Sequence, residues 1–316
     1  MANKKKLSLI IPVYNETKIL KYFVTHLITV IKKTKQIKNS KYQFEIIIIN
    51  DGSEDETIDT LNKLSDENKK IKYINLSKNF GKEAALTAGI DFCKGDIAIP
   101  IDVDFQDDPS IIGKLIEKYE EGYDVVLAKR EIRNDNFFKK NFAKLFYVLF
   151  NLLSDQKIPN NVGDFRLISK KAINTIKLYR EKNRFMKGIF AHIGFKTATV
   201  SFNRGERKID QPKQSIRKLI SLAFNAIINF STAPLKFIFF LGIILSTSAF
   251  VFGIFIILKK IIYNIDTPGF TSIMCVIILL GGNQILSIGI IGLYQSKMYL
   301  EIKNRPIYII SDTKGF

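Results

Sequence analysis

Phe44-Glu45-Ile46-Ile47-Ile48-Ile49-Asn50-Asp51-Gly52-Ser53 is a β-branched apolar run that ends abruptly in a polar turn. Such a run, bounded by turn-forming residues, is typical of a strand that is buried on both faces. Similar runs recur along the first part of the chain, with segments of helical periodicity between them. We therefore expect strands at Leu7–Val13, Phe44–Asn50, Lys72–Leu76, Asp96–Ile101 and Tyr123–Lys129. Strands that alternate with helices predict an α/β fold with a mostly parallel sheet covered on both faces.

Polar clusters follow three of these expected strands. They are Asn15 with Glu16, Asp51 to Ser53, and Asp102 with Asp104. Ligands of open parallel sheets bind beyond the carboxyl ends of the strands, so one crevice would collect all three clusters. Any single cluster is equally well explained as a turn, because Asp, Gly and Ser favour turns. Their convergence at one edge of the sheet favours a functional site.

Asp102 and Asp104 are two residues apart at a strand end, so both side chains can face one divalent cation. Gln106 offers a further oxygen ligand. Oxygen ligands in an open geometry suit Mg²⁺ or Mn²⁺ bound together with a diphosphate. An Asp-x-Asp pair also occurs by chance in acidic loops, so the neighbouring motifs must show whether this pair binds a metal.

Two long stretches without charge, Phe237–Leu258 and Thr267–Ser296, lie near the C-terminus. Each is long enough to cross a bilayer as a helix. A pair of buried core helices is the alternative, but a soluble core of this size rarely needs two such stretches almost back to back. We therefore expect a catalytic region at 1–232, a two-helix transmembrane region at 233–296 and a tail at 297–316.

With two spans, both flanking regions lie on one side of the membrane. Lys297, Lys303 and Arg305 follow the second stretch, and the first part of the chain is strongly basic. The positive-inside rule then predicts a cell (inner) membrane protein whose catalytic region and both termini are cytoplasmic.

Two further segments, at about 136–154 and 214–232, carry apolar residues at helical spacing with basic residues beside them. We expect amphipathic helices at the membrane interface, although either stripe could instead pack on the catalytic region. In the second span, small residues would allow close helix contacts and a homo-oligomer, possibly a tetramer. These residues are Gly281, Gly282, Ser287, Gly289 and Gly292.

The chain has 48 Lys and Arg against 30 Asp and Glu, a formal net charge of +18. Such a charge suits nucleic acid, an acidic membrane or phosphorylated substrates. Since the spans already imply a membrane, membrane lipids are the economical partner and no nucleic acid is expected. Cys93 and Cys275 are the only cysteines, which argues against a disulfide scaffold or a cysteine metal site.

Four motifs occur in a characteristic order: Pro12-Val13-Tyr14-Asn15-Glu16, Asn50-Asp51-Gly52-Ser53, Asn79-Phe80-Gly81-Lys82-Glu83-Ala84-Ala85-Leu86 and Asp102-Val103-Asp104-Phe105-Gln106-Asp107. Gly163-Asp164-Phe165-Arg166-Leu167, Arg184-Phe185 with Gly188, and Arg204 with Arg207 follow them. This ordered set, with two spans after it, resembles glycosyltransferase family two. The likeness is to its polyprenyl-phosphate branch, which includes dolichyl-phosphate mannose synthases and bactoprenol glucosyltransferases.

The resemblance implies a GT-A nucleotide-sugar domain and a role for each matching residue. The residues implied for the nucleotide-sugar donor are Pro12, Tyr14, Glu16, Asp51, Lys82, Asp102 and Arg204. Arg130 and Lys140 match positions for the lipid phosphate, and the metal ligands would be Asp102, Asp104 and Gln106. Asp164 and Asp104 are the implied catalytic residues, with Asp164 as a base or an acceptor-orienting group; pairing of Asp164 with Arg166 is the alternative.

Three positions depart from the family pattern. Asn50 replaces a common Asp, Asp108 replaces a frequent Pro, and Gln211-Pro212-Lys213 lacks the usual Gly-Ser before the Lys. The third departure affects the loop expected to close over the donor.

The implied reaction is transfer of a sugar, with UDP-linked glucose or a related hexose favoured as donor, to undecaprenyl phosphate. A phosphate acceptor is already anionic near neutral pH, so it can attack the anomeric carbon directly and invert its configuration. A processive polysaccharide synthase is disfavoured because the chain has no Trp for the Gln-x-x-Arg-Trp motif of those enzymes. A catalytically silent membrane scaffold or lipid-handling protein that retains the fold is the remaining alternative.

Overall fold

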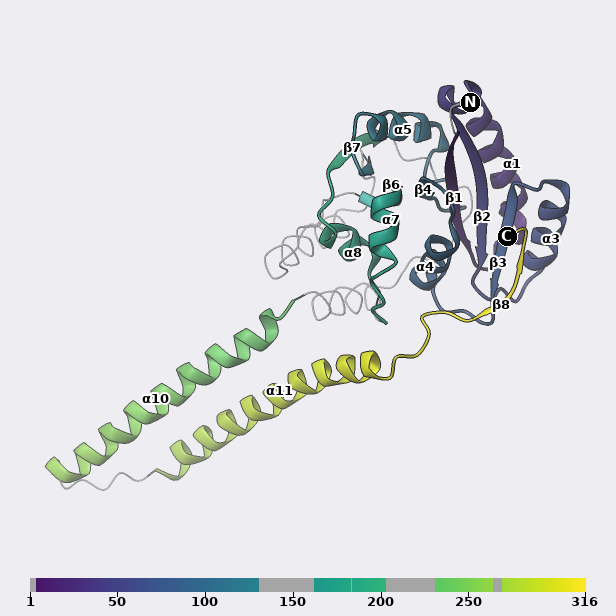
Figure 1. Cartoon of the computed structure of the whole chain (residues 1–316). Coiled ribbons are helices and arrows are strands. Elements are labelled where there is room, and N and C mark those ends of the chain that lie inside the picture. The colour runs from purple at the N-terminus through teal and green to yellow at the C-terminus, as the bar shows by residue number, and fades with distance from the viewer. Residues whose placement is uncertain (1–3, 131–161, 183, 203–230, 264–268) are drawn as a thin grey trace. The chain divides into compact units, whose positions relative to one another are not determined.

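The computed structural model describes residues 4–130, 162–182, 184–202, 231–263 and 269–316. The chain divides into two units: one contains the sheet and the last residues, Arg305–Phe316, and the other contains the two long C-terminal helices (Figure 1). Both expected amphipathic segments, at 136–154 and 214–232, fall almost entirely outside the described residues. The region boundaries at 232 and 296 remain predictions.

The first unit is built on one eight-stranded sheet in the order β7-β5-β6-β4-β1-β2-β3-β8. Its strands are β1 Lys5–Val13, β2 Tyr42–Asn50, β3 Ile71–Leu76, β4 Ile97–Pro100, β5 Val125–Arg130, β6 Val162–Ser169, β7 Thr197–Phe202 and β8 Ile310–Lys314. All five strands expected from the sequence are present, with ends that differ by at most two residues. The sequence analysis did not identify β6, β7 and β8.

The centre of the sheet is parallel: β1 pairs with β2 and β4, and β2 pairs with β3. β5 and β7 are also parallel, whereas β6 runs antiparallel between β4 and β5. β8 is antiparallel to β3 and forms the opposite edge of the sheet. The expectation of a mostly parallel sheet is confirmed, and the antiparallel β6 brings a strand from later in the chain beside β4.

Helices cover both faces of the sheet. They are α1 Thr17–Lys33, α2 Lys35–Lys38, α3 Thr57–Glu67, α4 Lys82–Phe92, the 3₁₀ helix η1 Pro109–Ile111, α5 Ile112–Glu120, α7 Lys170–Ile176 and α8 Met186–His192. One buried cluster joins α1, α3 and α5 to one face, and a second joins α4, α7 and α8 to the other. Successive strand residues alternate between these clusters, as Leu9 and Ile10 of β1 do. Burial of both faces explains why β1 and β2 are continuous apolar runs.

The last strand, β8, attaches the C-terminal residues to the sheet. Ser77 donates its backbone N–H to Ile309, Lys314 forms an ion pair of 2.6 Å with Asp66, and Phe316 packs edge-on against Phe92. β8 thereby covers the edge of β3, which would otherwise present unpaired backbone groups.

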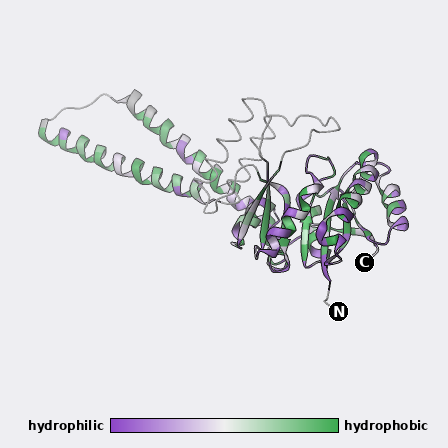
Figure 2. Cartoon of the chain, turned by 90° about the horizontal axis from the view of Figure 1, so that it is seen from above, coloured by the Kyte–Doolittle hydropathy of each residue, from purple (hydrophilic) through white to green (hydrophobic). Residues whose placement is uncertain are grey.

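The second unit consists of α10 Ala233–Tyr263 and α11 Phe270–Ile302. Each contains a 27-residue segment that is long and apolar enough to cross a membrane (Figure 2). No residue in the apolar window of either segment is buried. α11 continues to Ile302, six residues beyond the expected end of the second span at 296. The two helices could therefore span a bilayer, as their sequence predicts.

Candidate functional site

The loops after β1, β2 and β4 emerge at one edge of the sheet, because these strands are parallel neighbours. Asn15, in a left-handed conformation with φ of 54°, links two of the loops. Its N–H donates to Ser53 Oγ at 2.8 Å and its Oδ1 accepts from Glu54 N–H at 2.9 Å. Among the expected donor residues nearby, Pro12 is buried and Tyr14 is exposed. The Glu16 N–H donates to Thr57 Oγ1 at 3.2 Å.

Asp51 fastens the loop that leads into α4. Its Oδ1 accepts from Phe80 N–H at 2.8 Å and its Oδ2 from Gly81 N–H at 2.9 Å. Burial raises the pKa of the Asp51 carboxyl, and the two backbone hydrogen bonds offset only part of that rise. Asp51 was predicted to bind the nucleotide-sugar. Both of its carboxylate oxygens already accept hydrogen bonds from the backbone that positions Lys82.

Lys82, the first residue of α4, joins two of the predicted site carboxylates. Its Nζ lies 2.7 Å from Asp102 Oδ2 and 2.8 Å from Asp164 Oδ2. Burial lowers the pKa of Lys82, but the charges of Asp102 and Asp164 outweigh it, so the pKa rises. Lys82 is therefore a cation at neutral pH, held between the residue at the end of β4 and one in β6.

Asp164 is held as a carboxylate. Burial would raise its pKa, but the charges of Lys82 and Lys187 dominate and lower the pKa to about 2. Its Oδ1 is buried and has no hydrogen-bond partner among the described residues. The alternative of a pair with Arg166 is not what the described residues show: Asp164 pairs with Lys82, and Arg166 donates to the Gly163 carbonyl at 2.5 Å.

Phe105 shapes the loop that carries the expected metal ligands. It adopts a left-handed conformation with φ of 59°, and its ring lies 5.2 Å from that of Phe23 on α1. Non-glycine residues adopt this conformation at a cost of about 1–2 kcal/mol, which this packing must offset. The reversal allows Asp104 Oδ1 to accept from Gln106 N–H at 3.1 Å.

The oxygen atoms of this loop partly fit a divalent cation. Gln106 is 3% exposed, and its Oε1 is buried without a hydrogen-bond partner among the described residues. No group of three or more His, Cys, Asp or Glu gathers as a metal site in the described part of the chain. Mg²⁺ often binds through one or two carboxylates together with substrate phosphates, so Asp102, Asp104 and Gln106 suit a cation shared with a diphosphate.

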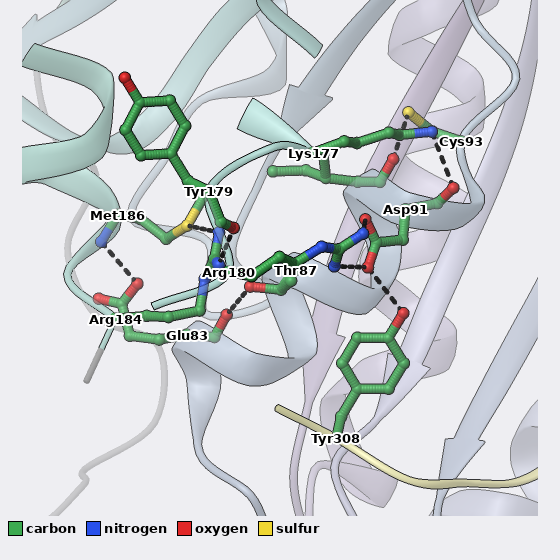
Figure 3. Close-up of polar contacts among 11 residues, drawn as sticks. Glu83, Thr87, Asp91, Cys93, Lys177, Tyr179, Arg180, Arg184, Met186 and Tyr308 are labelled. Carbon is green, nitrogen blue, oxygen red and sulfur yellow. Dashed lines mark hydrogen bonds and ion pairs between the residues drawn. The ribbon is translucent and has the colours of Figure 1, made fainter. Parts of the chain in front are cut away.

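Glu83 is a site residue that the sequence analysis did not single out. Its Oε2 accepts from the backbone N–H of Met186 at 3.0 Å, which ties α4 to the start of α8 (Figure 3). Burial and the charge of Asp164 raise the pKa of Glu83 to about 7. In the sequence, only its position next to Lys82 could have pointed to Glu83. The groups that bind it and raise its pKa come from β6 and α8, which are distant from α4 in the sequence.

Three predicted residues have no described side chain. Arg204 and Lys140 lie outside the described residues, and only the backbone of Arg130, at the end of β5, is described. Their roles with the donor diphosphate and the lipid phosphate remain predictions.

Comparison with known proteins places this geometry in a family. Residues 8–177 match the model of glycosyl transferase family 2. The chain is 43% identical over 311 residues to "Uncharacterized glycosyltransferase sll0501" of Synechocystis, covering 98% of this chain and 96% of that protein. It is 41% identical over 310 residues to "Prophage bactoprenol glucosyl transferase homolog" of Escherichia coli, covering 98% and 99%.

Among solved structures, a glucosyl-3-phosphoglycerate synthase from Mycobacterium tuberculosis aligns with a TM-score of 0.47 and 17% identity, covering 71% of this chain and 78% of that one. The family match runs from within β1 to the end of α7 and includes the ends of β1, β2 and β4, whereas Arg204, after β7, lies beyond it. The full-length relatives also cover the two apolar helices. The chain belongs to glycosyl transferase family 2, with a GT-A fold, in the branch represented by the bactoprenol glucosyl transferases.

Proposed function

We propose that this protein transfers a hexose, with inversion, from a UDP-linked donor to undecaprenyl phosphate. The relatives named as bactoprenol glucosyl transferases match almost the whole chain, which favours a lipid phosphate acceptor and glucose as the sugar. The main observation behind the proposal is that Lys82 forms ion pairs with both Asp102 and Asp164. These three charged side chains lie together where the nucleotide-sugar and the lipid phosphate would meet.

The donor would lie across the loops after β1, β2 and β4. Pro12, Tyr14, Glu16 and Asp51 would surround the nucleoside, and Arg204 would bind the diphosphate. Mg²⁺ or Mn²⁺, held by Asp102, Asp104 and Gln106, would neutralise charge on the departing nucleotide diphosphate. Lys82, whose Nζ lies 2.7 Å from Asp102 Oδ2, would add a protein cation beside the metal.

The acceptor needs little help from a base. Its phosphate is already ionised near neutral pH, and Asp164, with a pKa of about 2, is ionised as well. A carboxylate held by Lys82 suits an orienting role better than proton removal, since a base works best when its pKa is near the working pH. A single displacement from an α-linked donor would give a β-linked lipid phosphate sugar.

The apolar helices α10 and α11 would hold the enzyme in the cell membrane beside its lipid substrate. We place the catalytic unit and both termini in the cytoplasm, where nucleotide-sugars are made. β8 belongs to the sheet, so the segment after α11 lies on the same side as the catalytic unit. A homo-oligomer formed through the small residues of α11 is part of the proposal.

The test uses the full chain in detergent with Mg²⁺ or Mn²⁺, undecaprenyl phosphate and a panel of nucleotide-sugars. Release of nucleotide diphosphate should require the lipid, the metal and Asp104, and Asp104→Asn should reduce it by on the order of 10² or more. Asp108→Asn, four residues further along the same loop, is the matched control and should retain activity. Product NMR should show an inverted anomeric centre; a retained centre would contradict the single displacement. No release across the panel would instead favour the silent scaffold.

A further inference from the structure

A cavity of about 220 Å³ lies between the sheet and α8. β5, β6, the start of β7 and α8 contribute its walls, and Leu127, Val162 and Phe190 are among its apolar lining residues. The cavity is on the same face of β6 as Asp164, because Val162, Asp164 and Arg166 alternate with residues that face the other way. Val162 and Arg166, the neighbours of Asp164 on that face, both line it.

Arg166 is a buried cation at this cavity. Its side chain is 3% exposed, and its guanidinium lies 3.9 Å from the centre of the Phe190 ring. A guanidinium has five N–H donors. Within the described residues, the one hydrogen bond from the Arg166 side chain goes to the Gly163 carbonyl, and Nε is buried without an acceptor.

Burial lowers the pKa of Arg166 to about 10, while the charges of Asp164 and Glu83 oppose that fall. Arg166 therefore remains a cation near neutral pH. Buried charges are costly unless they are paired and hydrogen-bonded. No carboxylate lies within 4.0 Å of Arg166 among the described residues, and its buried Nε–H is a donor left without an acceptor there.

Lys187 adds a second cation to the lining. It is half-buried on α8 and forms no ion pair within 4.0 Å in the part of the chain that the structure describes. Its charge nevertheless lowers the pKa of both Asp164 and Glu83, so it lies close to the site. The hydrogen bond from Met186 N–H to Glu83 holds the backbone next to Lys187, which is among the residues that line the cavity.

Two cations among apolar walls define the chemistry of the ligand. A nucleoside diphosphate would bring polar ribose and base groups that these walls do not satisfy. A phosphate monoester of an apolar alcohol matches both parts, since guanidinium and ammonium groups bind phosphate oxygens and the apolar residues accept alkyl carbons.

We propose that this cavity binds the acceptor, with Arg166 and Lys187 as ligands of its phosphate and the apolar walls around its first carbons. The proposal rests on the proposed function and adds a subsite to it.

Binding can be tested without turnover, using the full chain in detergent and three soluble probes: geranyl phosphate, inorganic phosphate and geraniol. Titration calorimetry should show geranyl phosphate binding at least tenfold more tightly than inorganic phosphate, and no binding of geraniol. Equal affinity for the two phosphates would overturn the apolar part of the proposal and leave a free-phosphate site.

Two variants assign the binding to this cavity. Lys187→Ala should weaken geranyl phosphate and inorganic phosphate alike by about tenfold. Ala191→Leu, which fills part of the lining, should weaken geranyl phosphate about tenfold and inorganic phosphate much less. Lys171→Ala, an exposed lysine on α7 away from the lining, is the matched control and should leave both affinities unchanged. Unchanged affinities in both cavity variants would overturn the proposal.

The transfer assay separates this proposal from the proposed function. If the enzyme transfers sugar and neither cavity variant raises the KM for the lipid phosphate, the subsite is wrong and the function stands. If the enzyme transfers no sugar but binds geranyl phosphate in a manner sensitive to both variants, the subsite stands and the function is wrong.

Discussion

Lys82 Nζ lies 2.8 Å from Asp164 Oδ2, and this ion pair joins the first turn of α4 to the antiparallel strand β6. The two residues are far apart in the sequence, and the residue next to each of them forms a further hydrogen bond. Glu83, which follows Lys82, binds the backbone of α8, and Gly163, which precedes Asp164, accepts from Arg166. This pair therefore connects the loop after β4, through Asp102, with the strand that carries Arg166 at the cavity.

Replacing Lys82 should reduce turnover more than it reduces stability. In Lys82→Met the carboxylates of Asp102 and Asp164 lose their shared cation, and we expect kcat to fall by on the order of 10². Steady-state kinetics with saturating donor and lipid phosphate would measure this. Lys82→Arg keeps the charge and should retain much more activity than Lys82→Met. A Lys82→Met enzyme with unchanged kcat would show that the ion pair is only structural.

Glu83 should make stability depend on pH. Its pKa is raised from 4.5 to about 7 in the folded protein, so between these values the folded state binds a proton that the unfolded state has released. Protonation of Glu83 therefore contributes its full stabilisation below about pH 4.5, and this contribution is lost as pH rises to about 7. Over that range the free energy of unfolding falls by at most ~1.4 kcal/mol per pH unit.

The Glu83→Gln variant isolates this contribution, because its neutral amide cannot titrate. Thermal unfolding of wild type and variant in the same detergent between pH 5 and pH 8 should show that the difference in stability shifts in favour of the variant as pH rises. A difference that does not change with pH would mean that the pKa of Glu83 is not raised. Glu54→Gln, an exposed change in the same unit, serves as the control.

Gly52 should not accept a side chain. Its φ is +65°, and a Cβ there would overlap the backbone of Lys78 and lie 2.6 Å from Asn79 N. We expect Gly52→Ala to lose more stability than the ~1–2 kcal/mol that a left-handed alanine costs. It should also weaken binding of the nucleotide-sugar, because Lys78 and Asn79 belong to the loop whose N–H groups bind Asp51.

Gly122 provides the matched control for that substitution. Its φ is +92°, but no atom lies within 4 Å of an added Cβ. The difference between the melting temperatures of Gly52→Ala and Gly122→Ala therefore measures the overlap with Lys78 and Asn79. Equal losses in the two variants would contradict a close approach at Gly52.

Tyr308 should contribute to the attachment of the C-terminal strand. Its hydroxyl donates to Asp91 Oδ2 at 2.8 Å, and Arg180 binds the same carboxylate through both terminal nitrogens (Figure 3). Tyr308→Phe should cost about 1 kcal/mol and make the residues after Asn304 more sensitive to limited proteolysis. Tyr22→Phe, at a position 75% exposed, should change neither property. Protection equal to wild type in Tyr308→Phe would show that the strand pairing alone holds the tail.

The sequence predicted the parallel half of the sheet because its strands are buried on both faces. β1 and β2 appear as unbroken apolar runs, and their residues fall alternately into the two buried clusters. β7 was not found because several of its residues are exposed, which leaves no apolar run to recognise. β8 is short and polar, and its pairing with β3 depends on residues more than two hundred positions earlier.

The candidate site was predictable where one loop carries the information. Asp102, Asp104 and Gln106 lie close together in the sequence, so the metal-binding role that we predict for them follows from their spacing alone. Other features of the site depend on β6 and α8 lying beside α4, and the sequence contains no local sign of that arrangement. These features are the ion pairs of Lys82, the hydrogen bond from α8 to Glu83, and the position of Arg166 at a cavity.

β8 also imposes an order of events on biosynthesis. A ribosome completes α10 and α11 before it reaches Ile310, so the edge of β3 stays uncovered until the residues of β8 are made. An uncovered strand edge is open to pairing with other chains. The eight-stranded sheet can therefore be completed only after both long helices have left the ribosome.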